Sequence, residues 1–82
     1  MDFDMLVDIT WTRWEDITLK RYGNNATFAQ MFEVAQEAAC WVADEAGLPP
    51  LAVTLYGELK AVLVRLEHTN EIVIRTRPMI WH

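Results

Sequence analysis

Cysteine is nearly absent from this chain: Cys40 is the only one among 82 residues, so a disulfide within the chain is impossible. The two histidines, His68 and His82, lie far from Cys40 in the sequence, and the ligand spacing of a zinc site is missing. No apolar run approaches the roughly 18 residues that a membrane span needs. The first residues, MDFDMLVD, lack the basic start of a signal peptide. These absences predict a cytoplasmic protein that binds no metal, no cofactor and no membrane.

Glycine and proline are also scarce, with three of each, and 52% of the residues are hydrophobic, which argues against a disordered chain. The length predicts one domain, residues 1–82, near the size at which a single core barely suffices. Small domains often gain stability from a disulfide, a metal or a second chain. Because the first two are not expected here, we expect a homo-oligomer or a protein that binds a partner.

Basic residues are outnumbered by acidic ones, which gives a net charge of −5. Residues 1–47 contain nine acidic and three basic residues, a net charge of −6, whereas residues 48–82 contain three and four, a net charge of +1. Phosphate backbones should repel the first half of the chain. We therefore do not expect the chain as a whole to bind nucleic acid.

Residues 2–12 alternate between apolar and polar side chains, a pattern typical of a half-buried strand. Trp11 ends the apolar row and is expected in the core, whereas Thr10 falls on the polar face. The full apolar row is Phe3, Met5, Val7, Ile9 and Trp11.

Residues 13–22 allow two interpretations. As the second strand of a hairpin, the segment matches apolar to apolar side chains across the ladder and leaves Trp14 exposed beside the turn. As a helix, it would begin with a capping box at Thr12 and Glu15 and end at Gly23. We favour the hairpin because it uses more of the apolar residues.

Residues 28–46 predict a long helix with a well-defined start and end. Thr27 can cap the helix with Gln30 three residues later, and Gly47 follows as a stop before two prolines. Helical spacing gives a predicted core stripe of Phe28, Met31, Phe32, Ala35, Ala39, Val42 and Ala46.

The last third of the chain is predicted to be mainly strands. Residues 51–56 resemble a short strand that ends at Gly57, and residues 72–77 resemble another. Residues 59–67 fit a strand or a helix; the helix would continue through Gly57 at a cost of about 1 kcal/mol relative to alanine. We favour a hairpin, which gives the order β-β-α-β-β-β. The predicted class is α+β, a mainly antiparallel sheet with one long helix on one face.

Candidate chemical sites are weak in this sequence. Asp2, Asp4 and Asp8 share one face of the predicted strand, but calcium sites need turns and further oxygen donors that are missing. Cys40 has acidic neighbours, which disfavour the reactive thiolate. His68 lies in a predicted turn, and no nucleophile or orienting group accompanies it. We therefore do not expect an enzyme.

Exposed tryptophans beside acidic residues are the strongest functional signal. On the predicted helix, Glu33, Glu37 and Asp44 form a stripe opposite the core, and Trp41 lies outside the core stripe. Tryptophan is enriched at protein interfaces because it contributes a large contact area at little entropic cost. The predicted protein interface comprises Trp14, Glu33, Glu37, Trp41, Asp44 and Trp81.

The expected function is therefore a small acidic protein-binding module, an inhibitor or adaptor whose partner has a basic surface. Immunity proteins and phage-encoded antagonists of host machinery share this composition, and the likeness is one of composition only. One alternative is a self-associating structural protein that joins copies through an edge strand or exposed tryptophans. A further alternative is nucleic-acid binding through the face of the predicted C-terminal hairpin that carries Arg65, Arg75 and Arg77.

Overall fold

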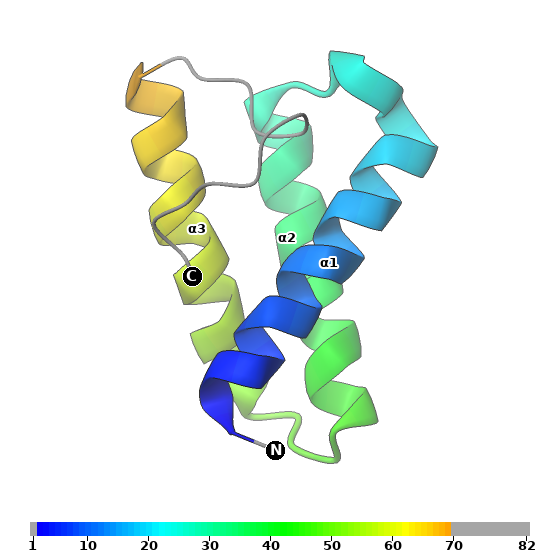
Figure 1. Cartoon of the computed structure of the whole chain (residues 1–82), viewed down its shortest axis with the longest axis vertical. Coiled ribbons are helices and arrows are strands. Elements are labelled where there is room, and N and C mark those ends of the chain that lie inside the picture. The colour runs from blue at the N-terminus through cyan, green and yellow to red at the C-terminus, as the bar shows by residue number, and fades with distance from the viewer. Residues whose placement is uncertain (1, 70–82) are drawn as a thin grey trace.

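The computed structural model describes residues 2–69, which fold into three helices packed side by side (Figure 1). These are α1 (Phe3–Tyr22), α2 (Phe28–Glu45) and α3 (Leu51–Thr69), and a short 3-10 turn, η1 (Gly23–Asn25), follows α1. α2 packs against both other helices and most extensively against α3, whereas α1 and α3 touch each other least. Within this part of the chain, none of the helices combines the length and the hydropathy that crossing a membrane requires.

The predicted α+β fold is wrong. Residues 2–69 contain no strand, so the expected β-β-α-β-β-β order and its antiparallel sheet are replaced by a helical bundle. The strand predicted at residues 72–77 lies outside the described residues. The edge strand that was one expected route to self-association is also missing from residues 2–69.

Threonine explains why residues 2–12 were mistaken for a strand. Thr10, assigned to the polar face, is fully buried, and its hydroxyl donates a hydrogen bond of 2.7 Å to the carbonyl oxygen of Leu6. Met5 and Ile9, assigned to the core, are 51% and 39% exposed. The buried residues of α1 follow helical spacing instead: Leu6, Thr10, Trp11, Trp14 and Thr18.

The helical interpretation of residues 13–22 is the correct one, although the helix begins earlier than that interpretation placed it. Its N-cap is Asp2, whose carboxylate accepts a hydrogen bond of 2.8 Å from the backbone N–H of Met5. Gly23 ends the helix with a φ of 64°, a conformation that favours glycine, and its N–H donates to the carbonyl oxygen of Leu19.

Both tryptophans of α1 lie in the core, which confirms the prediction for Trp11 and corrects the one for Trp14. Their rings are 1% and 0% exposed and meet edge to face, with centroids 5.1 Å apart. Trp14 Nε1 donates a hydrogen bond of 2.8 Å to the carbonyl oxygen of Met31 on α2, which satisfies its polar group inside the core. The predicted hairpin placed Trp14 beside an exposed turn, whereas in the helix adjacent residues point roughly 100° apart and Trp14 reaches α2.

The helix predicted at residues 28–46 is confirmed as α2, and both of its ends form as expected. Thr27 Oγ1 accepts a hydrogen bond of 3.1 Å from the Gln30 N–H, and the Gln30 side chain accepts one of 3.0 Å from the Thr27 N–H. Gly47 adopts a φ of 73°, and its N–H donates to the carbonyl oxygen of Asp44 at 3.0 Å.

α2 buries a wider face than the predicted stripe because it packs against a helix on each of two sides. Within the stripe, Phe28 and Phe32 are only partly buried and Ala46 is exposed. The buried residues outside the stripe are Val34, Ala38 and Ala43. The sequence also predicted that residues 28–46 would be the only long helix. In the described chain, α1 and α3 are long helices as well.

The strand predicted at residues 51–56 and the segment 59–67 are both parts of α3. The buried side chains of α3 have the three- and four-residue spacing of a helix, which the sequence offered as the alternative to a hairpin. They are Leu55, Leu59, Leu63 and Leu66. Val53 is β-branched, a type of residue enriched in strands, but it lies on α3 and is 80% exposed.

Replacing Gly57 with alanine should raise the free energy of unfolding by about 0.5–1 kcal/mol, since glycine is a poor helix former. Gly57 is exposed within α3, and an added Cβ would meet no atom within 4 Å. Urea unfolding followed by circular dichroism measures the change. A loss of stability would mean that position 57 is a turn, as the sequence-based prediction placed it.

Candidate functional site

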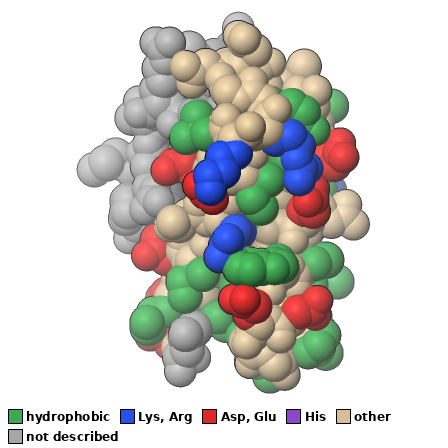
Figure 2. Space-filling model, turned by 90° about the vertical axis from the view of Figure 1, so that its right-hand side faces the viewer, with side chains coloured by type: hydrophobic (Ala, Val, Ile, Leu, Met, Phe, Trp, Pro, Cys, Tyr) green, Lys and Arg blue, Asp and Glu red, His purple; other side chains and the backbone are tan. Residues whose placement is uncertain are grey.

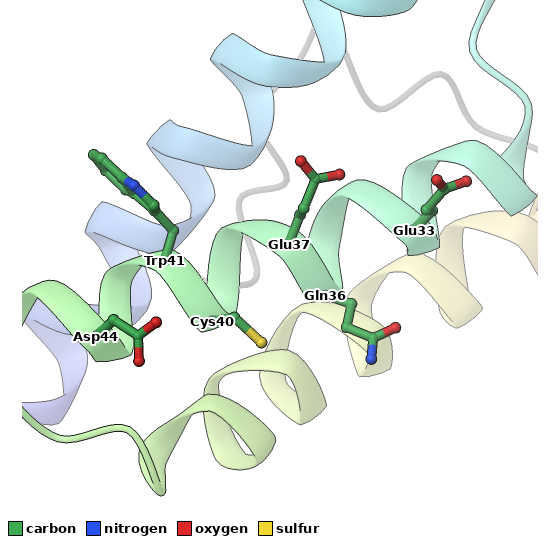
Figure 3. Close-up of a pocket in the computed structure, with 6 residues that line it drawn as sticks. All are labelled: Glu33, Gln36, Glu37, Cys40, Trp41 and Asp44. Atoms are coloured by element: carbon green, nitrogen blue, oxygen red, sulfur yellow. The ribbon is translucent and has the colours of Figure 1, made fainter.

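The outward surface of α2 brings together four of the predicted interface residues. Glu33, Glu37, Trp41 and Asp44 are all exposed, and they recur at intervals of three or four residues, which places them on one side of the helix. With two neighbours they line a shallow depression along α2 (Figure 3). We call this set the α2 face: Glu33, Gln36, Glu37, Cys40, Trp41 and Asp44.

Trp41 is the large apolar side chain of the α2 face, and its predicted partial exposure is confirmed at 41%. The guanidinium carbon of Arg13, on α1, lies 3.5 Å from the centroid of the Trp41 ring, a close cation–π contact. Trp41 also borders a second depression between α1 and α2, where Ile9 and Glu45 are among the lining residues. The indole therefore borders two adjoining depressions, and three of the six residues that line the one along α2 are acidic.

An ion pair fixes Glu37 within the α2 face. Arg21, in the last turn of α1, donates two hydrogen bonds to the carboxylate of Glu37, at 2.7 Å and 2.9 Å. These bonds hold the pKa of the Glu37 carboxyl below its ordinary value, and the same contact raises the pKa of Arg21. The pair orients Glu37 and joins α1 to α2 at the surface.

Replacing Arg21 with glutamine should shift the titration of Glu37 to higher pH, as measured by NMR of the side-chain carboxyl. The pKa of Glu37 is lowered in the folded chain, so the pair stabilises the fold above the ordinary pKa of glutamate. That contribution disappears as the pH falls through the lowered value. It should be small, because both side chains are more than a third exposed. An unchanged titration midpoint would contradict the described contact.

Negative charge dominates the rest of the α2 face. α2 contains four acidic residues and no lysine or arginine. In the part of the chain that the structure describes, Glu37 is the only one of the four with an ion pair, which leaves Glu33, Asp44 and Glu45 uncompensated. Figure 2 shows a side of the molecule on which apolar surface is bordered by acidic and basic side chains.

Of the remaining predicted site residues, the structure describes Trp14 and Arg65, and neither belongs to this face. Trp14 lies in the core, and Trp81 lies outside the described residues. Arg65 is exposed on α3, where it lines a groove together with residues of α1. The prediction that it belongs to a hairpin is therefore wrong. Arg75 and Arg77 lie outside the described residues.

The structure also locates the residues that the sequence offered as weak candidates for metal binding or catalysis. Asp2 caps α1, and Asp4 and Asp8 lie on the same helix rather than on a strand face. His68 lies in the last turn of α3 rather than in a hairpin turn. Cys40 is exposed on the α2 face.

Sequence reasoning missed the two arginines of α1 that contact the α2 face. Arg13 and Arg21 are eight residues apart, so the helical interpretation of α1 would have placed them on one side of it. Their partners on α2 depend on how the two helices pack, which no local pattern contains.

Comparison of the chain with protein-family models, with curated proteins and with solved structures found no match.

Proposed function

We propose that this chain is a protein-binding module, an inhibitor or adaptor, that uses the α2 face against a basic surface of another protein. The observation that carries the proposal is the partly exposed ring of Trp41 beside carboxylates that form no ion pair within residues 2–69. Binding, rather than catalysis on substrates, is the activity that this combination of side chains supports.

The two kinds of side chain have separate tasks in this proposal. Trp41 supplies anchoring, because a tryptophan buries a large area on binding and immobilises few rotamers. Glu33 and Asp44 attract a basic partner over distance and speed its association. Because carboxylates carry negative charge as phosphate groups do, the proposed target surface is a basic site where the partner protein binds nucleic acid.

Replacing Trp41 with alanine should weaken binding of a captured partner by about 2 kcal/mol, which is roughly 30-fold. The partner would be captured from the native cell with the tagged chain, identified by mass spectrometry and measured by calorimetry. Association of the unmodified chain should also slow when salt is added, because exposed charges are screened.

Val53→Ala is the matched control, since Val53 is 80% exposed on α3 and does not line the α2 face. It removes apolar surface without touching the proposed interface, and affinity should stay unchanged. Full affinity in the Trp41 variant, or an equal loss in both variants, would contradict the proposed function.

A further inference from the structure

The α2 face already holds a guanidinium group, that of its own chain. Arg13 reaches across from α1 and stacks on Trp41, with its guanidinium carbon 3.5 Å from the ring centroid. Arginine stacks on aromatic rings better than lysine because its charge is planar, delocalised and weakly hydrated. The contact shows which chemical group the exposed indole accommodates.

The surroundings of Trp41 can accept further positive charge. On one side, Glu33, Glu37 and Asp44 line the depression along α2, and no basic residue of the described part of the chain lines it. On the other side, Glu45 lines the same depression as Arg13. Of these carboxylates only Glu37 forms an ion pair within residues 2–69, so a second cation arriving at the ring would meet uncompensated negative charge.

We infer that the α2 face recognises an arginine-bearing segment of a protein partner, whose guanidinium stacks on Trp41 in place of Arg13. This inference rests on the proposed function and names the chemistry of the partner. Arg13 then acts as an internal competitor that occupies one face of the ring in the free protein, where Trp41 remains 41% exposed. An exposed cation–π contact corresponds to about a two- to fivefold effect on an equilibrium constant, so a partner with several contacts can displace it.

A short arginine peptide, acetyl-Gly-Arg-Gly-Arg-Gly-amide, is the probe for this inference. It would be titrated into the isotope-labelled chain while NMR follows the indole N–H of Trp41 and the backbone amides of the α2 face. Signals of the α2 face should shift and saturate with the arginine peptide. They should not shift with the same peptide carrying citrulline, which keeps the shape of arginine and lacks its charge.

Substitutions then separate competition at the ring from a general effect of charge. Arg13→Gln should tighten binding of the arginine peptide by about two- to fivefold, because the internal competitor is gone. Lys20→Gln removes the same charge from the same helix, and Lys20 pairs with Asp16 rather than Trp41, so its effect should be smaller. Trp41→Leu, which keeps an apolar side chain, should weaken binding by about two- to fivefold. Circular dichroism would verify the fold of each variant.

The inference is overturned if the citrulline peptide binds equally well, or if Arg13→Gln tightens binding no more than Lys20→Gln does. Its failure is distinct from failure of the proposed function. If a captured partner depends on Trp41 while the arginine peptide neither binds nor competes with it, the proposed function stands and this inference falls.

Discussion

Replacing Trp14 with alanine should lower the free energy of unfolding by about 3–5 kcal/mol. The side chain is 0% exposed, packs edge to face against Trp11 and bonds to the carbonyl oxygen of Met31 on the neighbouring helix. The substitution removes the ring and also leaves that carbonyl group without its side-chain donor. Since small domains have total stabilities of roughly 5–15 kcal/mol, a large part of the bundle's stability is at risk. Urea unfolding followed by circular dichroism measures the loss.

Two further variants show which property of Trp14 matters. Trp14→Phe keeps an aromatic ring and removes the N–H donor, so it should cost about 1–3 kcal/mol. Trp41→Ala makes the same truncation at a ring that is 41% exposed, and it should cost much less stability than Trp14→Ala. Equal losses at the two positions would contradict the assignment of Trp14 to the core and Trp41 to the surface.

The contrast between these tryptophans shows where the sequence was informative. α2 has a clear apolar stripe and a capping box, so its existence, its ends and the exposure of Trp41 followed from local pattern. In α1, two of the five buried positions are threonines, and a pattern that counts threonine as polar hides the helical period. The hairpin favoured on that pattern then placed Trp14 beside a turn, where it was expected to be exposed.

The candidate site could be predicted only in part, because a local sequence pattern shows only what lies within one helix. Glu33, Glu37, Trp41 and Asp44 came from one helix and needed only its period. Arg13 and Arg21 contact that helix across an interface, so their roles depend on tertiary packing that follows only after α1 is known to be a helix. A pattern within one segment contains no information about such contacts.

Replacing Leu59 with alanine should lower the free energy of unfolding by about 2–5 kcal/mol. Leu59 is 0% exposed and belongs to the core cluster that includes both tryptophans of α1, so its removal leaves a cavity at the centre of the bundle. The loss would be measured by urea unfolding, under the conditions used for Trp14→Ala.

Val64→Ala is the control that distinguishes a helix from the predicted hairpin over residues 59–67. In the hairpin, Val64 shares an apolar face with Val62 and Leu66 and should be costly to truncate. In α3 it is only partly buried, and alanine is the better helix former, so the loss should be much smaller than for Leu59. A larger loss at Val64 than at Leu59 would contradict the helix, because strand pairing places Val64 in the core whereas helical spacing buries Leu59.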